Sequence, residues 1–144
     1  MLRKFMFLRS SWSRGIQALF VALIAACVGC RETIKLTEVQ RVKSGAVDIV
    51  LLSRDGALHQ KDPFTIEFRS APGGDLLDVG IVRASATMPM PGMPMFGTIE
   101  VRPTDVPGRY TAKGSLEMAG GWRIALEWEG PAGRGKIDFA GTVQ

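Results

Sequence analysis

The chain has 144 residues, with 18 Lys and Arg against 14 Asp and Glu, and the excess of positive charge lies entirely before residue 30. Four basic residues precede that position, so the remainder carries 14 charges of each sign and lacks the positive footprint of a nucleic-acid-binding domain. Both cysteines also fall at or before residue 30, which excludes a disulfide framework or a thiolate metal site in the rest of the chain.

The first 30 residues have the pattern of an export signal. A basic start over 1–14, without any acid, is followed by an uncharged and mostly apolar run of 16 residues, 15–30. A membrane-spanning helix needs roughly 20 residues, so a cleaved signal is the better interpretation and a short uncleaved anchor is the alternative. We predict a signal segment over 1–30 and one compact domain over 31–144.

Both cysteines lie at the end of this segment. The sequence Ile24-Ala25-Ala26-Cys27 is similar to a bacterial lipobox, in which the cysteine is lipidated and becomes the mature N-terminus, and Cys30 is a second candidate. Ordinary signal cleavage and a disulfide between the two cysteines are the alternatives. Lipidation would anchor the domain to a membrane, on the periplasmic side or at the cell surface.

Residues 31–144 show apolar and polar alternation with a period of two, and helical periodicity is absent. Gly- and Pro-containing turns separate the alternating segments. The expected strands cover 33–39, 46–53, 64–70, 79–86, 98–102, 109–116, 121–129 and 136–139. This pattern predicts an all-β fold, a single immunoglobulin-like antiparallel β-sandwich of seven or eight strands.

The two most regular strands predict which side chains form the core. The inward residues of the two strands are Trp122, Ile124, Leu126 and Trp128, and Phe64, Ile66 and Phe68. Glu67 and Arg69 are expected on the solvent side of their strand. We expect the two tryptophans to centre the core, because each buries on the order of 200 Å².

The stretch MPMPGMPM, residues 88–95, holds four methionines and joins two of the expected strands. Pro91 and Gly92 fit the two central positions of a type II turn, which needs φ near −65° and then a positive φ. Met90 then faces Met93, Met88 faces Met95, and all four sulfurs project to one side. A stiff open loop is the alternative, because type II turns match strand twist poorly.

Thioethers in this arrangement suggest a soft metal ion. A thioether is uncharged and suits Cu(I), or Ag(I) as its surrogate, rather than Zn²⁺, Mg²⁺ or Ca²⁺. Methionine also avoids the disulfide chemistry that disables cysteine in an oxidising compartment. The alternative is an adaptable apolar lid over the end of the sandwich, or an adhesive patch for a partner.

Two residues outside the loop are further candidates. Met118 precedes the Trp122 strand and would assist the four loop methionines, Met88, Met90, Met93 and Met95, or would pack at the core or edge. His59, the only histidine of the chain, follows an expected turn; a solvated loop residue is its default interpretation, with metal ligation as the alternative.

Three spaced motifs carry a family resemblance: Met-Pro-Gly-Met at 90–93, Pro-Gly-x-Tyr at 107–110, and Met118 with Gly120 or Gly121 before Trp122. Over roughly 45–143 the chain resembles the YtkA-like domain, related to FixH-type proteins. The resemblance implies a small exported or membrane-anchored β-sandwich, whose relatives occur beside copper handling, heavy-metal efflux and cytochrome oxidase assembly. Some relatives carry a histidine soon after the loop, whereas Met95 follows here, which favours a methionine-only site.

No catalytic constellation is recognised, because His59 has no accompanying nucleophile motif and no phosphate-binding glycine loop is present. We expect a non-enzymatic, exported and membrane-anchored accessory protein that binds Cu(I) through the Met-rich loop. A copper protein or a membrane protein is the expected partner. The alternatives are an envelope adaptor whose Met-Pro loop contacts a membrane-protein partner, and a structural domain whose loop is a packed lid.

Overall fold

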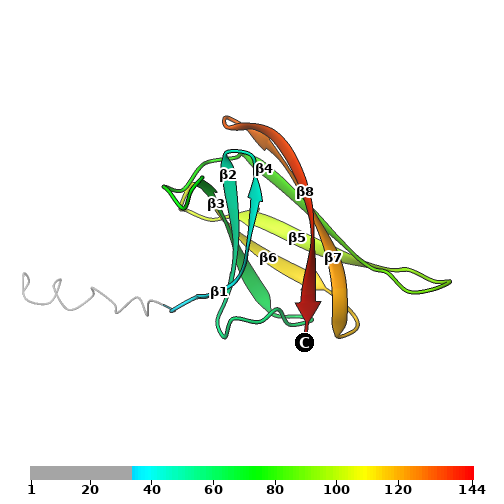
Figure 1. Cartoon of the computed structure of the whole chain (residues 1–144). Coiled ribbons are helices and arrows are strands. Elements are labelled where there is room, and N and C mark those ends of the chain that lie inside the picture. The colour runs from blue at the N-terminus through cyan, green and yellow to red at the C-terminus, as the bar shows by residue number, and fades with distance from the viewer. Residues whose placement is uncertain (1–33) are drawn as a thin grey trace, which may run out of the picture. The chain divides into compact units, whose positions relative to one another are not determined.

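The computed structural model describes residues 34–144, so the signal segment and the lipidation candidates Cys27 and Cys30 lie outside the described residues. Within 34–144 the chain forms eight strands (Figure 1). They are β1 (Thr37–Ser44), β2 (Val47–Ser53), β3 (Pro63–Ser70), β4 (Ile81–Met88), β5 (Met95–Pro103), β6 (Arg109–Ser115), β7 (Gly120–Gly130) and β8 (Gly133–Val143). In this part of the chain, no helix meets the length and hydropathy needed to cross a membrane.

All strand pairs are antiparallel, in the spatial order β1-β2-β3-β6-β5-β4-β7-β8. The sheet curves around one core, so that β1, β2 and β3 lie across from β7 and β8 (Figure 1). The β2–β3 connection is hydrogen-bonded to the chain just after β8, where the Gln144 N–H donates to the Leu58 carbonyl at 2.8 Å. The predicted all-β, immunoglobulin-like sandwich is confirmed, with eight strands.

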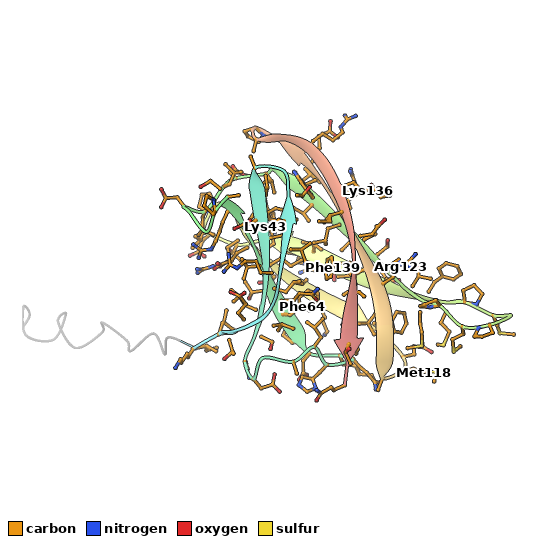
Figure 2. The ribbon with its side chains drawn as sticks, in the orientation of Figure 1. Lys43, Phe64, Met118, Arg123, Lys136 and Phe139 are labelled. Carbon is orange, nitrogen blue, oxygen red and sulfur yellow. The ribbon has the colours of Figure 1, made fainter. Side chains whose placement is uncertain are left out.

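The predicted core faces are also confirmed. The inward residues of β7 and β3 are all buried: Trp122, Ile124, Leu126, Trp128, Phe64, Ile66 and Phe68. Phe64 of β3 and Phe139 of β8, both labelled in Figure 2, belong to the same buried core. The Tyr110 hydroxyl donates to the Gly80 carbonyl at 2.8 Å, and burial together with the nearby Asp78 carboxylate raises the pKa of Tyr110.

Two sequence-based expectations need correction. The first strand was expected at 33–39 but runs from Thr37 to Ser44, because Gly45 (φ +60°) makes a tight turn that pairs Ser44 with Val47. Glu67 was expected in solvent but is 3% exposed. The side chains of Arg69 and Arg109 cover its carboxylate. The alternation of residues along a single strand contains no information about a partner such as Arg109 on another strand.

The ring of Trp128 lies against Gly135, its direct partner on the neighbouring strand β8. A β-carbon on Gly135 would overlap the Trp128 ring. That ring cannot move away freely, because it packs edge-on against the fully buried Phe68, with centroids 5.4 Å apart.

We therefore expect Gly135→Ala to lower the free energy of unfolding by about 1–3 kcal/mol, the usual range for overpacking a core. Urea unfolding followed by tryptophan emission measures this change. Gly121→Ala is the matched control, because a β-carbon there meets no atom within 4 Å. An equal loss in both variants would show that backbone entropy, and not the Trp128 contact, determines the result.

Candidate metal centre

The Met-rich segment forms the tip of the β4–β5 hairpin, which extends well beyond the neighbouring strands (Figure 1). β4 ends at Met88, β5 begins at Met95, and these two residues are direct partners across the pair. Gly92 has φ +82°, the value that a type II turn requires after Pro91. The backbone thus has the register and turn that the sequence predicted.

The five candidate methionines differ in their surroundings. Met88 is buried in the core at 7% exposure, and Met90 and Met95 are half-buried against the same core. Met93 at the turn is 74% exposed, and Met118 in the β6–β7 connection is 46% exposed. Met118 lies at the periphery of the sheet (Figure 2). The structure therefore divides the set into three inner thioethers and two outer ones.

Met88 lies close to the start of β7, the strand that carries Trp122. The β4–β7 ladder ends where Thr87 pairs with Arg123, one position before Met88 on β4 and one position after Trp122 on β7. A β-carbon on Gly120 would lie 3.1 Å from the Met88 methyl carbon, which brings that side chain to the start of β7. The Trp122 indole N–H donates to the Met118 carbonyl at 2.9 Å, which ties the β6–β7 connection to the same cluster.

The ligands offered at this place are neutral. Residues 88–97 contain no charged side chain, and the described residues hold no group of three or more His, Cys, Asp or Glu suited to a metal ion. Hard divalent cations require charged or carbonyl oxygens. Among the donors at the hairpin tip, thioether sulfur is the one that suits a soft monovalent ion.

His59 forms its hydrogen bond with Asp55 and not with any residue of the methionine cluster. Its Nε2 is 2.6 Å from Asp55 Oδ2, and the pair lines a pocket of about 290 Å³ in the β2–β3 connection together with Asp62 and Phe64. The hydrogen bond to Asp55 raises the pKa of His59, and the same bond lowers the pKa of Asp55 to about 2. The structure thus gives His59 a carboxylate partner and does not bring it to the methionines.

The shifted pKa values predict a pH window for this pair. The stabilisation from Asp55 is present above its ordinary pKa of 3.8 and is lost as the pH falls towards 2. The stabilisation from His59 is present below its ordinary pKa of 6.5 and is lost as the pH rises through the raised value. The pair therefore contributes most between these ordinary values.

An NMR titration of the His59 ring protons is expected to give a pKa above 6.5 that Asp55→Asn returns to about 6.5. Asp62→Asn is the control, since Asp62 acts on His59 only as a nearby charge and should lower the value less. If Asp62→Asn has the larger effect, the hydrogen bond to Asp55 is not the cause.

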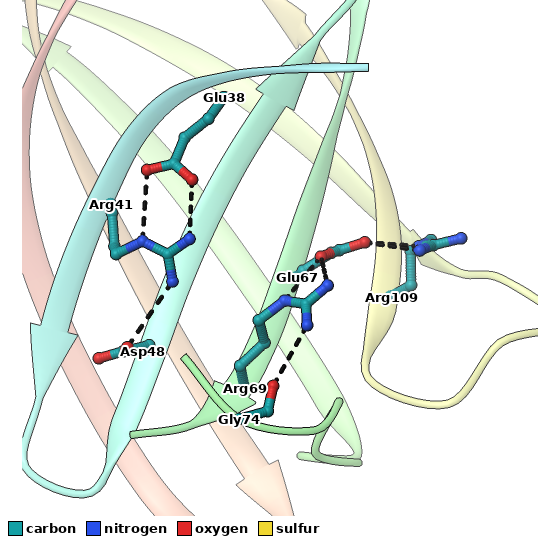
Figure 3. A network of polar contacts seen from close by, with 7 residues as sticks. All are labelled: Glu38, Arg41, Asp48, Glu67, Arg69, Gly74 and Arg109. Carbon is teal, nitrogen blue, oxygen red and sulfur yellow. Dashed lines mark hydrogen bonds and ion pairs between the residues drawn. The ribbon is translucent and has the colours of Figure 1, made fainter. Parts of the chain in front are cut away.

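Sequence reasoning missed two buried acids. Glu67 accepts bonds from Arg69 and Arg109, and Asp48 faces Arg41 at 3.7 Å (Figure 3). Asp48 also accepts a bond from the Gly73 N–H at 2.8 Å. The second carboxylate oxygen of Asp48 is buried without a hydrogen-bond partner. An acid inside the apolar run AVDIVLLS was the available signal for Asp48. These groups lie outside the methionine cluster.

Comparison with known proteins gives one family match. A search of curated proteins finds none that matches. Among solved structures, the chain is similar to PcoC, a methionine-rich copper resistance protein from Escherichia coli, at 16% identity and TM-score 0.44, covering 61% of this chain and 86% of that one. It is also similar to FetP from uropathogenic E. coli, as isolated (12%, TM-score 0.46, covering 75% and 95%) and as a copper-bound variant (11%, TM-score 0.48, covering 75% and 97%).

Similarities at this level are too low to carry a functional argument. The family match is independent of them and spans β1 to most of β7, including the whole Met-rich hairpin. The YtkA-like family model matches residues 39–127, more than half of the sequence, and the chain therefore belongs to the YtkA-like family.

Proposed function

We propose that this chain is an exported copper-handling protein that holds Cu(I) in the thioethers of the β4–β5 hairpin. The observation that carries the proposal is that Met88, Met90 and Met95, which lie next to the turn of this hairpin, all pack against the core. Met93 and Met118 extend the set outward. The role is binding and transfer rather than catalysis.

The donor chemistry supports Cu(I) over other ions. The domain after residue 30 contains no cysteine, so methionine is its main soft ligand. Thioethers stay uncharged at every pH and form no disulfides, which suits an oxidising compartment outside the cytoplasm. A monovalent ion also needs less compensating charge than a divalent ion in a segment without acids.

The division into inner and outer methionines supports exchange of the ion with a partner. An ion held by inner sulfurs has exposed sulfurs at Met93 and Met118 through which ligands can be replaced one at a time. Anchoring through lipidated Cys27, or through Cys30, would keep this exchange at a membrane surface beside a copper protein or a membrane protein.

Titration of the full chain with Ag(I) or with Cu(I) under reducing conditions tests the proposal. Methionine methyl resonances in a ¹³C-labelled sample should shift up to one equivalent of metal, with the largest shifts at Met88, Met90 and Met95. Zn²⁺ should cause no shift at the same concentration. Unchanged methyl resonances with two equivalents of Ag(I) and of Cu(I) would rule the proposal out.

A second function, an envelope adaptor, is favoured by the exposure of Met93 and Phe96, at 74% and 78%, on the protruding hairpin. Exposed apolar side chains of this size are typical of surfaces that contact a partner. The two functions differ in what they require of the loop. Replacing its four methionines by leucine should preserve the adaptor function, because the loop stays apolar, but should abolish metal binding, because that requires sulfur ligands.

A further inference from the structure

We infer that the indole of Trp122 forms the floor of the metal site and contributes a cation–π contact to the bound monovalent ion. This inference rests on the proposed function and adds to it a residue that is not a thioether. It also gives the site an optical signal that can be read separately from metal binding itself.

The registers of three strands bring Met95, Met88 and Trp122 towards one row. Met95 of β5 pairs with Met88 of β4, and the β4–β7 ladder ends at Thr87 and Arg123, so its extension by one position would set Met88 opposite Trp122. Residues in one row across a sheet share a face, and direct neighbours have Cβ atoms roughly 4.5–5.5 Å apart. Both Met88 and Trp122 are buried, so the shared face is the inward one.

The Trp122 ring also approaches the hairpin closely at Gly97 of β5. A β-carbon on Gly97 would lie 3.1 Å from Cζ3 of Trp122, so the indole reaches under β5 two residues beyond Met95. Gly97 leaves space that the Trp122 ring shares with the Leu116 side chain, whose Cδ2 would lie 2.6 Å from the same β-carbon. The ring therefore lies under β5, in the core against which the half-buried Met90 and Met95 also pack.

A hydrogen bond fixes the orientation of the Trp122 ring. The indole N–H is used by the Met118 carbonyl at 2.9 Å, so the polar edge of the ring points to the β6–β7 connection. Trp122 is 1% exposed, so side chains rather than water cover the rest of its surface. The thioethers of the row are among the groups in position to cover it.

The chemistry of a monovalent ion among thioethers makes this ring useful. The ion gives up hydration, yet residues 88–97 supply no negative charge. The π face of an indole attracts a cation within about 6 Å of the ring centroid, more strongly than that of tyrosine or phenylalanine, and the attraction grows in a desolvated site. Trp122 thus offers electrostatic compensation without a carboxylate.

Single-tryptophan chains test the inference directly. Trp12→Phe with Trp128→Phe leaves Trp122 as the emitter, and Trp12→Phe with Trp122→Phe leaves Trp128. Trp128 is the matched control, because it lies on the same face of β7 near the other end of the strand and packs edge-on against Phe68. One equivalent of Ag(I) should change the emission of Trp122 and should leave that of Trp128 unchanged.

The second measurement is affinity. Trp122→Phe keeps an aromatic ring with a weaker π face, and it should weaken Ag(I) binding, followed by methionine methyl shifts, by roughly three- to thirty-fold. If this variant does not fold, Trp122→Tyr takes its place, and the emission measurement on native Trp122 does not depend on either variant.

The outcomes separate the two proposals. Methyl shifts without a change in Trp122 emission, or with unchanged affinity in the aromatic variant, would overturn the role of Trp122 and leave the thioether site in place. The absence of methyl shifts would overturn the site itself. Methyl shifts together with a Trp122-specific emission change and weakened binding in the variant would support both.

Discussion

Replacing Met88 and Met95 together by leucine is expected to weaken Cu(I) and Ag(I) binding by more than about 100-fold while the chain stays folded. Groups that merely orient metal ligands typically contribute 10- to 100-fold to affinity, so the loss of two ligands should exceed that range. These two residues are chosen because they are direct partners across β4 and β5 and lie on the core side.

Leucine is the informative substitution because it removes the sulfur and keeps the volume. A Met-to-Leu exchange in a core usually costs less than about 1.5 kcal/mol, so a loss of binding would not reflect unfolding. Competition with a chromophoric Cu(I) chelator measures the affinity, and urea unfolding of the same sample measures the stability.

The matched control replaces the two outer methionines, Met93 and Met118, which are 74% and 46% exposed. This variant loses the same number of sulfur atoms, but we expect it to lose less than about tenfold in affinity, because exposed side chains must be ordered before they can bind. A larger loss in the outer variant would place the ion at the turn. Unchanged affinity in both variants would favour the adaptor function.

The difference between inner and outer methionines shows how far sequence reasoning extends for this site. Pro91 and Gly92 predict the turn, and the turn alone determines that Met88 faces Met95. The approach of Met88 to the start of β7 depends on the β4–β7 register, which joins segments far apart in the sequence. Nothing in the local pattern MPMPGMPM distinguishes the buried Met88 from the exposed Met93.

The same distinction between local and distant information holds for the fold. Alternation within β7 and β3 was enough to place seven core side chains, because each strand has one inward face. Alternation failed at Glu67, whose burial depends on Arg109 of β6, 42 positions later in the sequence. It also misplaced β1, since this edge strand carries a bulge between Glu38 and Gln40 that breaks the period of two.

The buried position of Glu67 gives the second large prediction. Replacing Arg69 and Arg109 together by methionine should lower the free energy of unfolding by about 3–5 kcal/mol, the usual cost of leaving a buried charge unpaired. Arg69 contacts one carboxylate oxygen of Glu67 at 2.6 Å. Arg109, which is the direct partner of Glu67 on β6, contacts the other oxygen at 2.7 Å (Figure 3). Methionine preserves much of the aliphatic stem of each arginine.

The chain offers a control with the same local geometry. Arg102 donates two N–H groups to one oxygen of Glu100, two residues away, as Arg69 does to Glu67, but the Arg102 and Glu100 side chains are 75% and 60% exposed. Arg102→Met should therefore change the stability by less than about 1 kcal/mol. Urea unfolding of both variants gives the comparison.

A third substitution tests whether the unpaired charge of Glu67 causes the loss of stability. Adding Glu67→Gln to the double arginine variant should recover part of the lost stability, because a neutral carboxamide costs less to bury than an unpaired carboxylate. If Glu67→Gln lowers the stability further, or if the double variant loses no more than Arg102→Met, water reaches Glu67 once the arginines are removed. Its burial then depends on the two arginines, and the surrounding strands β2, β3 and β6 do not by themselves exclude water from it.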